Sequence, residues 1–277
     1  MLSYKHGYHA GNEADVLKHI CLTQAYKSLK RHHKSITYID THSGSGIYKF
    51  ASDYMSKNKE YIRGIAKLEN YKFESPSINF YIKVLKNINN SKKLIFYPGS
   101  PLIMSNLSDK LDKLLFYELH NNEFILLRKN LSKNINSKIF NQDGFEFLNN
   151  KMNSENQTLV LIDPSYEIKE DFNKVLNIIK ILDEKFYNLT AIIWYPILNI
   201  EKNDLFIENV RKLGSNRITR IELPLKKYND DIGIKGSGIL LFDGSDFLIQ
   251  NMKNCVKELY HILKDEDCNI KPKIQRI

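Results

Sequence analysis

Apolar residues along the chain form short continuous runs, separated by longer stretches in which apolar positions recur every three or four residues. Runs of roughly four to eight apolar residues are typical of strands buried on both faces of a sheet. The intervening helical periodicity indicates crossover helices, so we expect an α/β protein with a mostly parallel sheet. The predicted strands cover residues 36–40, 114–118, 138–141, 158–163 and 190–195, the predicted helices 13–30, 121–131 and 172–185, and the predicted antiparallel pair 217–223 and 238–242.

One interval between predicted strands is unusually long. In doubly wound folds, the acidic residue that hydrogen-bonds a ribose hydroxyl lies roughly 20 residues beyond the glycine-rich turn after the first strand. Here the first strand ends at Asp40, and the next strand that ends in an acid reaches only Glu118. The residues between them mostly show the apolar periodicity of amphipathic helices. We therefore predict a single domain over residues 1–277, with residues 50–95 forming a helical subdomain inserted after the first strand.

Composition narrows the class of protein without naming a function. Hydrophobic residues make up 42% and charged residues 26%, as in ordinary folded domains. No apolar run approaches the roughly 20 residues of a membrane helix, and the N-terminus lacks an apolar signal-peptide core. Three cysteines without a CxxC pair indicate reduced thiols, so we expect a cytoplasmic location. The formal charge of +9 is compatible with a nucleic-acid partner, although a lysine bias across the whole chain explains it equally well.

The first strand leads into a glycine-containing turn. Asp40 is followed by His42 and by a GxG pair, Gly44 and Gly46, which lets backbone amides approach a nucleoside closely. Lys49 stands where a dinucleotide fingerprint needs its third glycine, which argues against a nicotinamide oxidoreductase. A tight turn without a ligand is the structural alternative.

The strongest apolar strand ends in Asp163, Pro164, Ser165 and Tyr166. One hypothesis is that this motif acts on the exocyclic amine of adenine. That amine is a poor nucleophile because its lone pair is conjugated into the ring. A carboxylate and a backbone carbonyl that accept its two N–H bonds would draw electron density onto the nitrogen and align it. An aromatic residue at the fourth position can stack on a flipped base. The alternative is a strand-terminating Asp-Pro turn with no catalytic role.

Further acids end other strands in the same manner. Glu118 suits a contact to ribose hydroxyls, and Asp143 suits a contact to an adenine amine. We expect Asp40, Glu118, Asp143 and Asp163 to converge on one cavity, because parallel strands end at a shared edge. Ser100 precedes a proline and is predicted to be a helix N-cap, either alone or with a cofactor contact as well.

The N-terminal residues 4–12 are rich in aromatic and basic side chains. His6, His9 and His42 invite a metal interpretation, but no carboxylate or thiol completes a ligand set at helical spacing, so we expect no metal. An arm that stacks on bases and neutralises phosphate fits these residue types better. The sequence has no heptad repeat of the kind that forms a coiled coil, so we expect a monomer.

Taken in order, these blocks resemble one family closely. The chain is similar to the RlmJ family of large-subunit ribosomal RNA adenine-N6 methyltransferases, and the resemblance runs along nearly its whole length. The residues that carry the resemblance are 1–6, 9–12, 14–19, 40–46, 97–102, 118–120, 143–145 and 194–196.

The resemblance implies a Rossmann-like class I methyltransferase fold, with a mostly parallel seven-stranded sheet and S-adenosylmethionine as cofactor. It implies that Asp163, Lys18 and Tyr4 are catalytic and that Tyr4, His6, Pro164 and Tyr166 bind the substrate. The implied cofactor contacts are His19, His42, Ser100, Glu118, Asp143, Gly144 and Asp163.

The same resemblance implies methylation of the N6 amine of one adenine in naked or immature 23S rRNA. The family motif reads Asp-Pro-Pro-Tyr, whereas this chain has Ser165 in its third position. Serine frees the backbone that proline would stiffen, so loss of activity stays open. Two alternatives stay open. The first is an adenine-N6 methyltransferase acting on DNA, and the second, which Ser165 supports, is a non-catalytic nucleic-acid-binding or DNA-utilisation factor that retains the fold.

Overall fold

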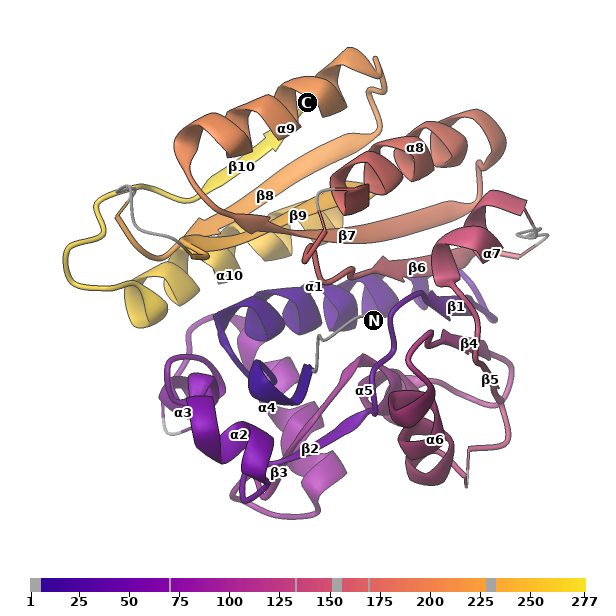
Figure 1. The fold of residues 1–277 in the computed structure, drawn as a ribbon, viewed down its shortest axis with the longest axis vertical. Coiled ribbons are helices and arrows are strands. Elements are labelled where there is room, and N and C mark those ends of the chain that lie inside the picture. The colour runs from indigo at the N-terminus through magenta and orange to yellow at the C-terminus, as the bar shows by residue number, and fades with distance from the viewer. Residues whose placement is uncertain (1–5, 70, 133, 151–155, 169, 228–232) are drawn as a thin grey trace.

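The computed structural model describes all residues except 1–5, 70, 133, 151–155, 169 and 228–232 (Figure 1). Within the described residues, the main sheet has eight strands in the order β10-β8-β9-β7-β6-β1-β4-β5. Neighbours from β7 through β6, β1 and β4 to β5 pair in parallel, and β9 runs antiparallel between β7 and β8. The strands are β1 (Thr37–Asp40), β4 (Lys113–Tyr117), β5 (Ser137–Phe140), β6 (Thr158–Ile162), β7 (Leu189–Ile197), β8 (Ile218–Pro224), β9 (Gly236–Phe242) and β10 (Lys273–Arg276).

The predicted strands are confirmed to within a few residues, but the predicted count of seven is wrong for the main sheet. The additional strand is β10, which pairs antiparallel with β8 at the edge. A separate two-stranded sheet joins β2 (Ile47–Lys49) to β3 (Phe96–Pro98). The three cysteines are buried free thiols, as expected.

Helices cover both faces of the main sheet, so its central strands are buried on both sides (Figure 1). Along β6, Leu159 and Leu161 belong to one hydrophobic core, whereas Val160 and Ile162 belong to the other, as the two-residue period of a strand requires. The first core packs against α1 (Glu13–Leu29), α4 (Pro76–Asn89), α5 (Ser100–Leu107), α6 (Asn121–Asn130) and α10 (Asp246–Leu263). The second core packs against α7 (Gly144–Asn150), α8 (Glu170–Lys185) and α9 (Ile200–Lys212).

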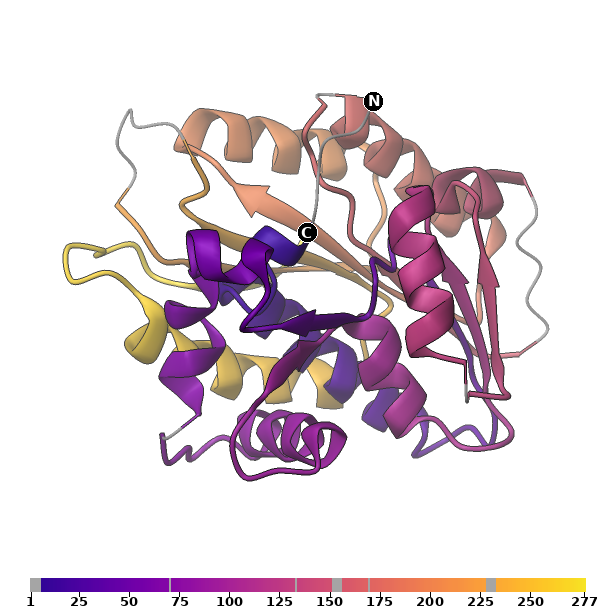
Figure 2. The same cartoon turned by 60° about the horizontal axis from the view of Figure 1, so that its bottom comes forward.

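The predicted inserted segment, residues 50–95, lies on the side of the sheet that carries α1 and α10 (Figure 2). Its buried side chains, Met55, Ile65 and Tyr81 among them, belong to the same core as α1. The segment is thus continuous with the sheet's own core. Its elements are α2 (Asp53–Asn58), η2 (Glu60–Ile62), α3 (Ile65–Leu68) and α4.

Two predicted helix starts have different outcomes. Asn12 caps α1 as expected, because its side chain accepts hydrogen bonds from the amides of Ala14 and Asp15. Ser100 does not cap α5: Gly99 is the capping position, and the serine side chain bonds Asp40 instead. In the described part of the chain, no helix is long and apolar enough to span a bilayer.

Candidate active site

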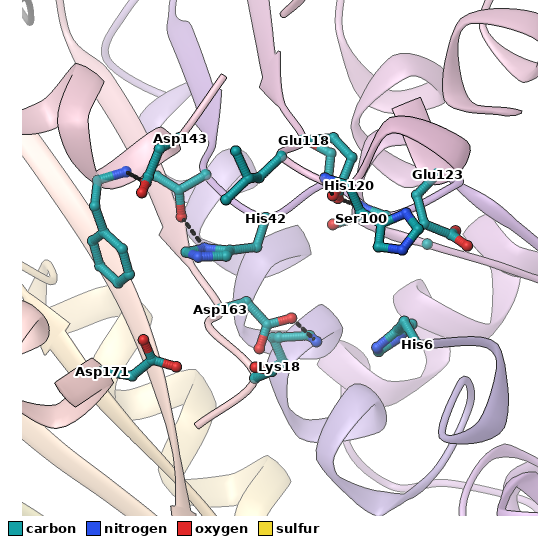
Figure 3. Close-up of a pocket in the computed structure, with 18 of the residues that line it drawn as sticks. His6, Lys18, His42, Ser100, Glu118, His120, Glu123, Asp143, Asp163 and Asp171 are labelled. Carbon is teal, nitrogen blue, oxygen red and sulfur yellow. Dashed lines mark hydrogen bonds and ion pairs between the residues drawn. The ribbon is translucent and has the colours of Figure 1, made fainter. Parts of the chain in front are cut away.

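A cleft of about 1070 Å³ opens at the carboxyl ends of β1, β4 and β6. Most residues that the sequence singled out for the cofactor reach it from separate elements (Figure 3). The predicted residues that line this cleft are His6, Lys18, His19, His42, Ser100, Glu118, Asp143, Gly144 and Asp163.

Asp40 contradicts the prediction that four strand-ending acids share the cavity. Its side chain is fully buried and does not line the cleft. It accepts a hydrogen bond from the hydroxyl of Tyr38 at 3.0 Å and also bonds Ser100. Burial raises the pKa of Asp40 to about 6. Asp40 therefore supports the cleft from beneath, by holding Ser100.

Glu118 and the Gly44 turn are locked together. The amide of Gly44 donates to one carboxylate oxygen at 2.8 Å, and the amide of His120 donates to the other at 2.7 Å. Gly44 has a φ of +59°, and a Cβ there would lie 2.2 Å from the hydroxyl of Tyr48, so any other residue would be strained and would have to displace that tyrosine. Burial raises the pKa of the Glu118 carboxyl. The turn thus presents a fixed carboxylate at the cleft wall.

A further part of the cleft wall consists of His42, Asp143 and Phe145. Thr41 donates its hydroxyl proton to the carbonyl of Leu161, so its oxygen accepts from Nδ1 of His42 at 2.8 Å. The ring packs edge-on against Phe145, whose amide donates to Asp143 at 2.8 Å.

A buried hydrogen-bond chain connects the inserted segment to the cleft. The hydroxyls of Tyr81 and Tyr97 lie 2.8 Å apart, and the Tyr97 hydroxyl lies 2.7 Å from Nδ1 of His19. The rings of Tyr97 and His19 also stack at 5.6 Å. Burial lowers the pKa of His19 to about 3, so the imidazole is neutral at physiological pH.

The deepest charges in the cleft belong to Lys18 and Asp163, which form an ion pair and point toward one another in Figure 3. Lys18 also pairs with Asp15 at 2.8 Å. Asp15 in turn contacts Nε2 of His6 at 3.0 Å. These four side chains form one continuous network at the base of the site.

A second cleft, of about 1350 Å³, lies on the other side of this network. The residues that line both clefts are His6, Lys18, Asp163 and Ser165. Tyr166 lines the second cleft, and its hydroxyl donates to the carbonyl of Trp194 at 2.7 Å.

Backbone and side-chain contacts fix the aromatic wall of the second cleft. Tyr166 has a φ of +52°, an uncommon conformation for a residue with a side chain. Trp194 is fixed by a hydrogen bond from its indole to Ser237 at 2.6 Å.

Two predicted substrate-binding residues are not placed in either cleft. Pro164 is buried and lines neither cleft, and Tyr4 lies outside the described residues.

Several cleft residues carry no sequence signal. Tyr48, Glu123, Asp171 and Lys174 line the first cleft, but none of them ends a strand. Asp15 appears in the sequence as a first-turn acid of a helix, a position common for structural reasons alone. Its burial and its contact with Lys18 become visible only when the fold is known.

The buried histidines predict a fall in stability at acidic pH. Burial lowers the pKa of His42 to about 4 and that of His19 to about 3, against 6.5 in unfolded chains. Depressed histidine pKa values stabilise the fold above pH 6.5, and this stability is lost as the pH falls toward 4. Asp40 acts oppositely between pH 6 and 4, because its folded pKa is raised.

We expect the free energy of unfolding to drop on the order of 2 kcal/mol between pH 7 and pH 5. Urea titrations at both pH values measure it, and His42→Gln should reduce the drop. An equal drop in that variant would assign the pH dependence to other groups.

The first cleft has the properties that an adenosine-containing cofactor requires. Glu118 offers a fixed carboxylate for ribose hydroxyls, and Gly44 and Gly144 both line the cleft. Nδ1 of His120, a residue that lines this cleft, is buried without a hydrogen-bond partner among the described residues. Within the described chain, no cluster of three or more His, Cys, Asp or Glu side chains could hold a metal.

The strand order, the antiparallel β9 and the acid-lined cleft at the strand ends define a class I S-adenosylmethionine-dependent methyltransferase. Within that class, the chain belongs to the RlmJ family. Residues 33–272 match the family model described as "RsmJ: Ribosomal RNA large subunit methyltransferase D, RlmJ".

Individual relatives agree with the family match. The chain is 35% identical over 261 residues to "Ribosomal RNA large subunit methyltransferase J" of Escherichia coli K12, covering 94% of this chain and 93% of that one. It is also 35% identical over 268 residues to the protein of the same name from Haemophilus influenzae, covering 96% and 95%. A crystal structure of a Legionella pneumophila protein, 32% identical, superposes with a TM-score of 0.87 over 97% of this chain and 98% of that one.

Proposed function

We propose that this protein transfers a methyl group from S-adenosylmethionine to the N6 amine of an adenine in 23S rRNA. The observation that carries the proposal is the Lys18–Asp163 pair in the wall common to two clefts. A cofactor in the first cleft and a base in the second would meet at Asp163. The names of the Escherichia coli and Haemophilus influenzae relatives support large-subunit RNA as the substrate.

In this proposal the first cleft holds the cofactor, which supplies an electrophilic methyl group on a sulfonium. Glu118 binds the ribose hydroxyls, and Asp143 accepts from the adenine amine. Gly144 lets the start of α7 approach the backbone of Thr41 closely beside the cleft, because a Cβ there would overlap Thr41. The remaining cofactor contacts are His19, His42, Ser100 and Asp163.

The second cleft receives the target adenine after it leaves the RNA stack. His6 and Tyr166 line this cleft, and both have rings that can pack against a base. The Trp194 carbonyl fixes the Tyr166 hydroxyl, so the ring is preorganised. Tyr4 keeps its predicted role in substrate binding, although the residue itself lies outside the part of the chain that the structure describes.

The chain contributes orientation and charge to the transfer. The Asp163 carboxylate, which lines both clefts, accepts one N–H bond of the amine. The Pro164 carbonyl, which lines neither cleft, keeps its predicted role as the acceptor of the second N–H bond when the base is bound. Together they direct the amine lone pair at the methyl carbon. The nitrogen need not lose a proton first, because the neutral amine is far too weak an acid. Lys18 holds the Asp163 carboxylate in place. The carboxylate and the carbonyl are both present despite Ser165, so we expect the chemistry to persist.

Methyl transfer from radiolabelled S-adenosylmethionine tests the substrate. We expect labelling of large-subunit RNA stripped of ribosomal proteins, and none of duplex DNA. Labelling of DNA alone would favour the DNA methyltransferase alternative. Cofactor binding without transfer to either polymer would favour a non-catalytic factor. The monomeric state and the cytoplasmic location stay predictions.

A further inference from the structure

Asp15 is a buried carboxylate, and it makes side-chain contacts that the capping of its helix does not need. It lies in the first turn of α1 and is 1% exposed. One oxygen accepts from the Lys18 ammonium at 2.8 Å, and the other accepts from the Gly11 amide at 2.8 Å and contacts His6. The cap of α1 is already supplied by Asn12. Burying a carboxylate is costly, so its position calls for another reason.

That reason lies in the charge balance around Lys18. Its side chain is only 4% exposed and contacts two carboxylates, Asp15 and Asp163. Burial opposes the charge on Lys18, but Asp15 first and Asp163 second outweigh it and raise its pKa above the ordinary value. Burial likewise opposes ionisation of Asp15, yet His6 and Lys18 hold its pKa well below the usual range. Asp15 and Lys18 are therefore both charged near neutral pH, and Lys18 also forms an ion pair with Asp163, which completes an Asp15–Lys18–Asp163 triad.

One lysine between two carboxylates leaves a net charge of about −1 on the triad, counted apart from His6, which contacts Asp15 on its other side. Without Asp15, the lysine would neutralise Asp163 completely. The difference matters during transfer. As the amine lone pair bonds to the methyl carbon, the C–S electrons return to sulfur and the positive charge moves onto the nitrogen. The nitrogen then releases a proton to water.

We propose that Asp15 is a positioning residue that neutralises Lys18, so that Asp163 presents net negative charge to the amine as the amine becomes cationic. This inference rests on the proposed methyl transfer and deepens it. Electrostatic preorganisation of this type acts strongly in a partly buried site, where a fixed charge is poorly screened.

The variant Asp15→Asn removes the charge and keeps the shape and an oxygen for the Gly11 amide. We expect kcat on RNA to fall about 10- to 100-fold, with KM for RNA within about 2-fold of wild type. A role limited to helix capping or folding predicts an unchanged kcat per folded molecule. Thermal melting gives the folded fraction for the comparison.

The double variant Asp15→Asn/Lys18→Gln separates charge balance from structure. It removes both charges of the buried pair and leaves Asp163 negative, with the glutamine amide able to donate to it. We expect it to exceed the kcat of Asp15→Asn by at least about 5-fold, although it carries one more substitution. A double variant as slow as Asp15→Asn, or slower, would overturn the proposal, and so would a single variant with wild-type kcat.

Calorimetry without RNA supplies a readout that does not depend on turnover. S-adenosylmethionine carries a positive charge that S-adenosylhomocysteine lacks, so Asp15→Asn should weaken binding of the first more than binding of the second. An unchanged ratio of the two affinities would contradict the charge argument even in a protein inactive on RNA. Wild-type protein that binds both ligands but methylates no RNA would instead count against the proposed function.

Discussion

Replacing Asp163 with asparagine should lower the rate of methyl transfer to RNA roughly 100- to 1000-fold, while the protein stays folded and binds cofactor. The asparagine amide presents N–H groups where the carboxylate accepts them, and it removes the negative charge beside Lys18. The fold should survive, because Lys18 keeps its second partner, Asp15. Initial rates with radiolabelled cofactor measure the effect, and calorimetry with S-adenosylhomocysteine verifies that the first cleft is intact.

Asp246→Asn is the matched control, because it makes the same chemical change on an exposed residue at the start of α10. Its rate should equal that of the wild type. If Asp163→Asn turned over as fast as this control, Asp163 would not hold the amine, and the catalytic interpretation of the strand end would fail.

The sheet was largely predictable because its central strands are buried on both faces. Strands such as β6 and β7 consist almost wholly of apolar residues, a pattern with few alternatives once helical stretches flank it. The edge strand β10 has the opposite character: it is short and mostly exposed, and its sequence Lys-Ile-Gln-Arg resembles a surface loop. Only its pairing with β8 makes it a strand, and that contact is not encoded locally.

The site was predictable where geometry follows from strand direction. Glu118, Asp143 and Asp163 follow parallel neighbours and reach one cleft, as a shared sheet edge dictates. Asp40 ends β1 in the same manner along the chain, but its side chain is fully buried against Tyr38 and does not line the cleft. What covers a strand end depends on tertiary contacts, so sequence spacing alone could not separate Asp40 from the other acids.

Gly144→Ala should cost on the order of 1–3 kcal/mol of stability and weaken cofactor binding about 100-fold. A Cβ at this position would lie 2.5 Å from the carbonyl oxygen of Thr41 and 2.6 Å from two of its carbons. The first turn of α7 must therefore move away from β1. That movement carries Asp143 and Phe145 with it, and both residues line the cleft. Chemical denaturation and titration with S-adenosylhomocysteine measure the two effects.

Gly214→Ala distinguishes damage to the cleft from a general loss of stability. Gly214 has a φ of +74°, and an added methyl group there would have no described atom within 4 Å, so alanine costs about 1 kcal/mol of backbone strain without a collision. Both variants should be less stable than wild type, yet only Gly144→Ala should bind cofactor poorly. Equal affinities in the two variants would mean that α7 can shift without disturbing the site, and Asp143 would then have no part in holding the cofactor.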